Sequence, residues 1–339
     1  MANRNIIISI KGKWFQVPAL NVNGKDIILR GEWLKIAFVH AEEWLETEVE
    51  DPALCVKALK SERSDGLQAD IFTFSQKLPA TNRKYSYFME RDSVAAIRVT
   101  TFNNWWDNLP QETRKNVRRA EKRGVIVEVK TLDASLLQDL LVLNNDSPVR
   151  QGKVFTHFGK TLEQVTKDQE AFLDRCDYIC GYVGDELVGV MKLIYRGDVA
   201  SILTFLPKAS HYDKRPANAL IAKAVELCEK KQISYLTYGM FNYGNKRDSS
   251  LKEFKIRNGF EEVLIPRYYV PLTVKGFVSV GMRLHRGLIG LLPNGLITFL
   301  LDVRMKLHDF RRSRCSSMPE RPNRTRQMER SNPPAGSTT

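Results

Sequence analysis

Residues 199–264 read VASILTFLPKASHYDKRPANALIAKAVELCEKKQISYLTYGMFNYGNKRDSSLKEFKIRNGFEEVL, and this stretch decides the fold class. Its short apolar runs at 199–205 and 233–238 predict buried strands. Between the two runs, Pro216 suits the first turn of a helix, and apolar residues then recur at helical spacing. Ser249 and Ser250 are the candidate caps of a second, shorter helix before a last strand. Strands that alternate with helices in this order predict a mixed α/β unit.

The remainder of the chain repeats this alternation. Residues 177–183 and 187–195 precede the strand at 199–205 and predict a three-stranded meander, because Gly-Asp turns separate them. The first hundred residues contain five strand-like segments, at 26–30, 34–39, 70–74, 85–90 and 94–99. They also contain one amphipathic helix, at 53–59. The sequence therefore predicts two α/β units.

Two blocks of residues carry a resemblance to a known family. The first block is Trp105-Trp106, then Leu109-Pro110-x-x-x-Arg114-x-x-x-Arg118-Arg119-Ala120-Glu121-Lys122-x-Gly124-Val125. The second block is Tyr235-x-x-Tyr238-Gly239, then Ser250-Leu251-x-x-Phe254-Lys255-x-x-x-Gly259-Phe260. In this order and spacing they resemble the FemAB-type branch of the GNAT superfamily, which includes BioF2-like acyltransferase domains. The resemblance implies an α/β (mixed α+β) fold of tandem GNAT-like units, with a central mixed, splayed sheet flanked by helices, and an acyltransferase activity.

We expect the chain to divide into five parts. They are an N-terminal GNAT-like unit (1–100), a basic helix and connecting strand (101–130), a C-terminal GNAT-like catalytic domain (131–271), an amphipathic helical segment (272–310) and a disordered basic tail (311–339). Within the fourth part, residues 288–301 carry no charge and are broken by a Pro-Asn-Gly turn, which predicts a helical hairpin. Such a hairpin either lies on an anionic membrane surface or packs on the protein.

Composition and charge limit the classes of function and partner that we expect for the chain. The chain has 339 residues and a net charge of +13, which favours phosphates, nucleic acid or anionic lipid as partners. Five scattered cysteines are typical of reduced intracellular thiols, and their spacing predicts no metal site. No run of eighteen uncharged apolar residues occurs, so we expect no transmembrane helix. These features predict a cytoplasmic protein, with peripheral contact at the inner face of the membrane left open.

The segment 101–124 predicts the most basic helix of the chain. Residues 114–123 include six Lys or Arg, and only Val117 and Ala120 are apolar. The basic face either binds an anionic ligand or carrier, or is a solvated face between the two units.

The resemblance implies a donor site between the splayed strand and the helix that begins at Pro216. Backbone N–H groups there polarise the donor carbonyl, and the positive helix end faces a pyrophosphate. The expected contacts are Phe205, Lys208, Lys214, Arg215, Ala217 and Asn218. Typical acyl-CoA-binding members have a glycine-rich Q/R-x-x-G-x-G/A at this loop, whereas residues 212–218 contain no glycine. This departure leaves aminoacyl-tRNA as the alternative donor to acyl-CoA.

Other residues are candidates for the chemistry and for the acceptor. Acyl transfer to an amine requires a base for the amine proton and stabilisation of the carbonyl oxyanion. The resemblance implies that Lys255, in the Phe-Lys pair of the late helix, serves the oxyanion. The candidate catalytic residues are Lys255, Tyr238, Asp213 and His211. The long loop at 144–161 predicts acceptor contacts from Arg150, Gln151, His157 and Phe158. Tyr243, which follows the strand at 233–238, is the fifth candidate for the acceptor.

Three functions follow as hypotheses. The first is an N-acyltransferase that moves an acyl group from acyl-CoA, or another thioester, to an amine on a sugar or a cell-envelope or polysaccharide precursor. The second is a FemAB-type peptidyltransferase that uses aminoacyl-tRNA, in keeping with the basic charge. The third is a non-catalytic scaffold of the same fold at the membrane surface.

Overall fold

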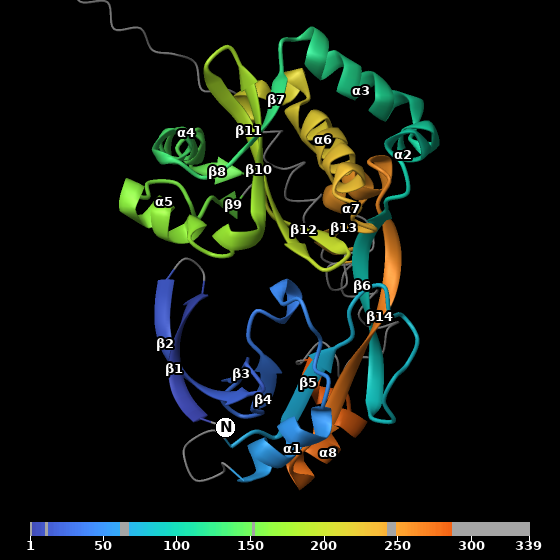
Figure 1. Cartoon of the computed structure of the whole chain (residues 1–339). Coiled ribbons are helices and arrows are strands. Elements are labelled where there is room, and N and C mark those ends of the chain that lie inside the picture. The colour runs from blue at the N-terminus through green and yellow to red at the C-terminus, as the bar shows by residue number, and fades with distance from the viewer. Residues whose placement is uncertain (1, 11–12, 62–67, 151–152, 243–248, 287–339) are drawn as a thin grey trace, which may run out of the picture. The chain divides into compact units, whose positions relative to one another are not determined.

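The structure is a computed structural model that describes residues 2–10, 13–61, 68–150, 153–242 and 249–286 (Figure 1). Residues 1–285 form one compact unit. None of the described helices is both long and apolar enough to cross a membrane.

Twelve strands of the described chain form one sheet. From one edge to the other they are β1 (Ala2–Ile10), β2 (Lys13–Val22), β3 (Lys25–Arg30), β4 (Ile36–Val39), β5 (Ile71–Ser75), β14 (Glu261–Pro271), β6 (Phe88–Arg98), β13 (Tyr235–Met240), β12 (Val199–Pro207), β11 (Glu186–Arg196), β10 (Cys176–Val183) and β7 (Ile126–Lys130). A separate small hairpin pairs β8 (Val149–Arg150) with β9 (Lys153–Val154).

The helices connect and cover these strands. The α-helices are α1 (Pro52–Ser61), α2 (Phe102–Asn108), α3 (Gln111–Lys122), α4 (Ala134–Asn144), α5 (Leu162–Gln169), α6 (Pro216–Lys230), α7 (Ser250–Arg257) and α8 (Val274–Gly281). The 3-10 helices are η1 (Glu42–Trp44), η2 (Leu173–Arg175), η3 (Ala209–Lys214) and η4 (Leu284–Arg286). Ser249 caps α7 by accepting a hydrogen bond from the Lys252 N–H, as the sequence predicts.

The two halves of the sheet have the same strand topology when each half is followed from its outer edge toward the centre. The strands β1, β2, β3, β4 and β5 correspond to β7, β10, β11, β12 and β13. In each half a helix, α1 or α6, connects the parallel pair, which is β4 with β5 and β12 with β13. The topology therefore contains two related α/β units.

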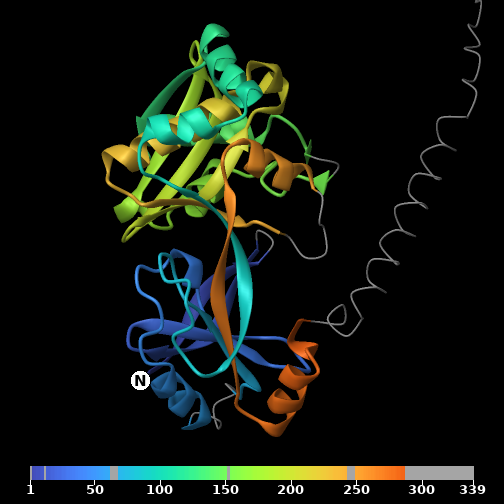
Figure 2. The same cartoon turned by 90° about the vertical axis from the view of Figure 1, so that its right-hand side faces the viewer.

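The sixth strand of each half is exchanged between the halves. β14, from the end of the second half, pairs antiparallel with β5, and β6, from the end of the first half, pairs antiparallel with β13. β6 and β14 also pair with each other, from Ala96 opposite Glu261 to Phe88 opposite Tyr269. Figure 2 shows this long pair running from one half of the sheet to the other.

The parallel strands of the second half separate after three residues. β12 pairs with β13 only where residues 199–201 lie opposite residues 235–237. At the last of these positions, the hydroxyl groups of Ser201 and Thr237 are 2.6 Å apart. Beyond it the strands diverge, which gives the splayed sheet that the motifs predicted.

The blocks that carry the resemblance pack on each other. Trp105 is buried and its indole N–H donates to the Asn258 carbonyl oxygen, 3.1 Å away at the end of α7. Thr113 on α3 donates its hydroxyl to the carbonyl of Arg257 at 2.8 Å. α3 also packs beside α6, as both views show (Figures 1 and 2). The basic helix is thus attached to the second half, with Val117 and Ala120 facing inward.

Two segments of the first half differ from the sequence-based expectation. β6 is one continuous strand where two were predicted at 85–90 and 94–99. Its polar middle pairs across the sheet, because Asp92 accepts from Arg267 and Ser93 donates to Glu262 on β14. β1 and β2 also form an antiparallel hairpin that the sequence pattern did not predict.

Candidate functional site

A pocket of about 360 Å³ lies over the four central strands, β5, β14, β6 and β13. Alternate side chains of a strand point to the same face of a sheet. Accordingly Ile265, Arg267 and Tyr269 of β14 line this pocket together with Asp92 and Val94 of β6. The other residues that line it are Glu42, Glu43, Ser75, Gln76, Lys77, Leu78, Arg196, Thr237, Gly239 and Met240. We refer to it as the central pocket.

Arg267 pairs with two of the other five charged residues that line the central pocket, Asp92 and Glu42. The Arg267 Nε donates to Asp92 Oδ2 at 2.5 Å, and its Nη1 lies 3.2 Å from Glu42 Oε2. Burial opposes the charge of Arg267, but the two carboxylates outweigh it and raise its pKa. Glu42 also accepts a hydrogen bond from the Ser75 N–H at 2.7 Å. This cluster connects η1 to the exchanged strands.

Glu43 differs from its neighbour Glu42. Its carboxylate has no hydrogen-bond partner in the described part of the chain, although the residue lines the central pocket. The side chain remains reachable by solvent, yet the surrounding protein atoms are close enough to raise its pKa by desolvation. The positive charges of Arg196, Arg267 and Lys255 act in the opposite direction. Glu43 is thus a carboxylate with a raised pKa whose hydrogen-bonding capacity is available.

Arg196 comes to the pocket from the end of β11. Its Nη1 donates to the backbone carbonyl of Glu43, and its Nε is buried with no hydrogen-bond partner among the described residues. Desolvation by burial lowers the pKa of Arg196. A guanidinium has five N–H donors, so this side chain retains donors for a ligand.

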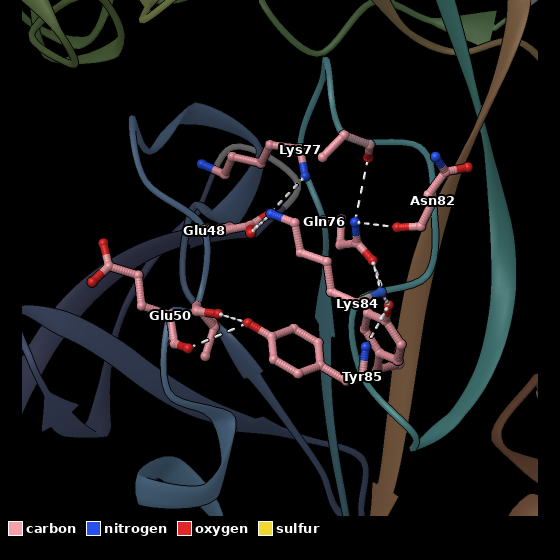
Figure 3. Close-up of polar contacts among 10 residues, drawn as sticks. Glu48, Glu50, Gln76, Lys77, Asn82, Lys84 and Tyr85 are labelled. Atoms are coloured by element: carbon pink, nitrogen blue, oxygen red, sulfur yellow. Dashed lines mark hydrogen bonds and ion pairs between the residues drawn. The ribbon is translucent and has the colours of Figure 1, made fainter.

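Lys77 lies where β5 enters the loop that precedes β6. Its ammonium donates to the Leu45 carbonyl, and desolvation lowers its pKa to about 7. Figure 3 shows the polar contacts that hold this loop. The Lys77 N–H donates to Glu48 at 3.2 Å, and the Tyr85 hydroxyl donates to Val49 O at 3.0 Å. The segment with Glu42 and Glu43 and the segment with Lys77 are therefore fastened to each other at the pocket.

Gln76 is the buried centre of the same loop. Its Nε2 donates to Asn82 O at 2.9 Å, and its Oε1 accepts from the Lys84 N–H at 3.1 Å and from the Tyr268 hydroxyl (Figure 3). Because both ends of one buried amide are satisfied, the loop has a defined conformation next to the pocket.

Lys255 lies behind the β13 wall of the central pocket. The side chain is fully buried, and its Nζ donates to the carbonyl oxygens of Tyr238 at 2.6 Å and Met240 at 2.7 Å. β13 has an irregular register between Thr237 and Met240, where Gly239 has φ +55°. Burial lowers the pKa of Lys255 to about 8. In this arrangement the ammonium supports backbone carbonyls of the splayed strand.

Two other predicted residues lie in the same splay. The Phe205 ring packs edge-on against the Tyr238 ring at 5.6 Å and is tilted against Phe254 at 5.9 Å. The Lys255 Nζ lies 4.5 Å from the centre of the Tyr238 ring. Aromatic side chains from β12, β13 and α7 thus occupy the opening between the diverging strands.

The predicted donor-loop residues gather around two carboxylates. Lys208 forms an ion pair with Glu186, and the His211 Nε2 lies 3.4 Å from the same carboxyl group. Arg150 donates to Pro207 O at 2.9 Å, and its Nη2 lies 3.8 Å from Asp146. The hydrogen bond from Lys208 and the charge of that lysine lower the pKa of Glu186. The structure therefore brings Lys208, His211 and Arg150 to one end of β12.

The helix α6 begins directly after η3. Arg215 has left-handed dihedrals there, with φ 60° and ψ 37°. Glycine is favoured in this conformation. Asp213 is 3.2 Å from the Arg123 Nη1, and Asn218 donates from Nδ2 to Asn258 Oδ1 at 2.9 Å. The side chains of Lys214 and Arg215 have no ion-pair partner in the described residues, and no acidic residue lies in the first turn of α6, which includes Ala217. This helix end can accept an anion.

The remaining predicted acceptor residues are apart from this group. His157 Nδ1 lies 3.3 Å from Asp168 Oδ2, and burial and then Lys160 lower the pKa of His157. Phe158 is partly exposed and follows it in the chain. Gln151 and Tyr243 lie outside the described residues.

None of the predicted site residues that the structure describes lines the central pocket. Its charged residues come from the β4–α1 connection, the end of β5, β6, the end of β11 and β14, which are distant in sequence. The sequence Arg-Gly-Asp at 196–198 is typical of a hairpin turn, and the structure has a turn there between β11 and β12. In the described residues, no cluster of three or more His, Cys, Asp or Glu side chains is arranged to hold a metal ion.

No protein-family model and no curated protein sequence matches the chain. Among solved structures, FemX is similar with a TM-score of 0.52 and 11% identity, over 78% of this chain and 87% of that chain. The structure of L-PGS from Bacillus licheniformis is similar with a TM-score of 0.50 and 15% identity, over 78% of this chain and 86% of that chain. These likenesses show that the chain shares the fold of FemX and L-PGS, which confirms the FemAB-like fold that its sequence motifs predicted, and the doubled strand order confirms the two related α/β units.

Proposed function

We propose that this chain is an N-acyltransferase that moves an acyl group from a thioester donor to an amine on a sugar or a cell-envelope or polysaccharide precursor. The observation that carries the proposal is the splay of β12 from β13 beside a charged pocket. Beyond Ser201 the backbone groups of β12 that face β13 have no strand partner. Such backbone N–H groups can polarise a donor carbonyl, while the adjacent pocket holds an amine.

The proposed donor site joins the splay to the first turn of α6. Lys214 and Arg215 are the cations available to a pyrophosphate, because Lys208 already pairs with Glu186. The loop lacks glycine, yet Arg215 has left-handed dihedrals at the start of the helix. That conformation lets a helix N-terminus approach an anion. These features support acyl-CoA as the donor. Phe205 on β12 and Asn218 on α6 are the other proposed contacts of the donor.

In the proposed chemistry, the amine nitrogen forms a bond to the acyl carbon, and the carbon–sulfur bond breaks. Lys255 acts by holding the Tyr238 and Met240 carbonyls, and so the course of β13, at the splay. His211 and Tyr238 are the proposed hydrogen-bonding groups on the donor side. Asp213 is engaged by Arg123, which makes it a positioning residue for η3 in this proposal.

A second donor class has an observation in its favour. The exposed side of α3 carries Lys115, Arg118 and Lys122, for which the described residues provide no acidic partner. Such a face suits a phosphate backbone, so aminoacyl-tRNA is the alternative donor for the same transfer. Here a carbon–oxygen ester bond, in place of a thioester, would break.

Contact with an anionic membrane is a further part of the proposal. Val274 and Phe277 on α8 are 83% and 72% exposed, and Trp33 beside them is 64% exposed. Lys275 lies over the Trp33 ring at 5.2 Å. Exposed aromatic and aliphatic side chains with a neighbouring cation are typical of a membrane interface. The predicted hairpin at 288–301 lies outside the described residues.

The test uses the full chain with acetyl-CoA, longer acyl-CoAs and charged tRNA as separate donors, and glucosamine as the acceptor. Mass spectrometry would detect an N-acylated product, and thermal shift would report donor binding, which must increase with donor concentration. Product from an acyl-CoA would support the first donor class, and product from charged tRNA alone would support the second. No product and no stabilisation with any donor would refute both transferase proposals.

A further inference from the structure

Two charges of opposite sign in the central pocket have hydrogen-bonding capacity that the described protein groups do not use. The Glu43 carboxylate accepts no hydrogen bond from the described residues, and the Arg196 Nε is buried without a partner. The two residues are adjacent, because Arg196 donates from Nη1 to the Glu43 backbone carbonyl. The buried Arg196 Nε costs free energy unless a ligand or water supplies its partner, and the exposed Glu43 carboxylate is open to a ligand from solvent.

The other charged residues of the central pocket already have protein partners. Arg267 is shared between Asp92 and Glu42, and the Lys77 ammonium donates to the Leu45 carbonyl. Glu43 and Arg196 thus lie side by side with hydrogen-bonding capacity that a ligand can use. A molecule that carries an ammonium and an anionic group is the complement of this pair.

We propose that the central pocket is the acceptor site and that it binds an amine that also bears an anionic group, a phosphate or a carboxylate. The ammonium of the acceptor lies on the Glu43 carboxylate, and its anionic group lies on the Arg196 guanidinium. This inference rests on the proposed acyl transfer and deepens it, because it names the acceptor class and the proton acceptor.

The pocket adjoins the site where the acyl group would arrive. Met240 lines the pocket, and its carbonyl is one of the two held by Lys255. Thr237 also lines it and marks the last paired position before the splay. The pocket volume is about 360 Å³. This volume is at the lower end of small-molecule sites and suits one sugar residue of an acceptor.

Glu43 then has a defined role in the transfer. The bound ammonium gives one proton to the Glu43 carboxylate, and the freed lone pair forms the nitrogen–carbon bond. The carbon–sulfur bond breaks with its electron pair on sulfur, and a proton from the attacking nitrogen neutralises the thiolate. The proton on Glu43 returns to solvent, so the carboxylate is regenerated. Desolvation raises the pKa of Glu43, and a higher pKa makes the carboxylate a stronger proton acceptor.

The inference is tested by binding without any donor. Isothermal titration calorimetry at pH 7 would compare four probes: glucosamine, glucose 6-phosphate, glucosamine 6-phosphate and 2-amino-2-deoxyglucuronic acid. We expect at least one of the two probes with both charges to bind ten-fold or more tightly than either single-charge probe. Which of the two binds more tightly distinguishes phosphate from carboxylate as the anionic group. Equal affinities across the four probes, or no binding of any, would overturn the inference.

Matched variants test which residue binds the ammonium of the ligand and which binds its anionic group. Glu43→Gln should lower the affinity for the probes that carry an amine by ten-fold or more and leave the affinity for glucose 6-phosphate unchanged. Arg196→Met should lower the affinity for the three anionic probes. Glu50→Gln is the control, because Glu50 lies in the same segment, is exposed and does not line the pocket. An equal loss for all probes in Glu43→Gln would contradict the assignment of the ammonium.

Failure of this inference can be distinguished from failure of the proposed function. If the dual-charge probes bind as expected but no donor gives a product, the acceptor site stands and the acyltransferase assignment fails. If product forms from glucosamine while the probes bind without the expected preference, the transfer stands and the dual-charge site fails.

Discussion

Replacing Lys255 by methionine removes the ammonium that holds two backbone carbonyls of β13 and keeps a side chain of similar length. Each hydrogen bond from a charged donor contributes about 1.5–3 kcal/mol, and its loss leaves a buried carbonyl unsatisfied. Relief from burying a charge offsets part of this loss. We therefore expect Lys255→Met to lower the free energy of unfolding by about 2–4 kcal/mol.

Urea denaturation at pH 7 would measure this change, with Lys252→Met as the matched control. Lys252 lies in the same helix and is only partly buried, over the Phe241 ring. Its replacement should change stability by no more than about 0.5 kcal/mol. If Lys255→Met were as stable as the control variant, the ammonium would not be supporting the splayed strand, and our account of β13 would be wrong.

The pH dependence of the same variant gives an independent check. Burial lowers the pKa of Lys255 from 10.5 to about 8, so the unfolded chain binds this proton more tightly than the folded chain between these values. Stability that comes from this group therefore rises with pH from about 8 to 10.5. The parent should show this rise and Lys255→Met should lack it, a difference on the order of 3 kcal/mol. Parallel stability curves for the two proteins would refute the shift.

The remaining predictions concern packing and the membrane. A Cβ at Gly259 would lie 2.7 Å from the Trp105 Nε1, on a backbone with φ +84°. Gly259→Ala should therefore cost about 2–4 kcal/mol in thermal or urea unfolding. Gly184, at φ +59° with nothing within 4 Å of such a Cβ, provides the control. Gly184→Ala should cost about 1 kcal/mol. Phe277→Ser should reduce co-sedimentation with phosphatidylglycerol vesicles and leave the weaker binding to phosphatidylcholine vesicles unchanged; equal binding by parent and variant would contradict a lipid role for α8.

Local patterns were sufficient for most of the second half of the fold. The apolar runs, the proline at the start of α6 and the serine cap of α7 each act over a few residues, so the sequence displays them directly. β6 was divided in the prediction because its polar residues 91–93 resemble a turn. The cause of that error is tertiary, since Asp92 and Ser93 find their partners on β14.

The central pocket could not be predicted in the same way. Glu43 and Arg196 belong to different halves of the chain and meet only because the sheet is complete. Lys255 shows the complementary case. Its motif was visible in the sequence, but its contacts with two backbone carbonyls depend on the irregular course of β13. Residue type indicated which side chain mattered, and the fold determines what it touches.

The exchange of β6 and β14 affects how this protein can fold while it is synthesised on the ribosome. β5 is complete early in synthesis, yet its antiparallel neighbour, residues 261–271, is among the last described segments to be made. The first half therefore has an unpaired strand edge until residues 261–271 have emerged. Pairing between strands so distant in sequence is slow, and an open edge invites association with other chains. During synthesis the edge of β5 must therefore be protected until β14 has been made, and only then can the sheet close.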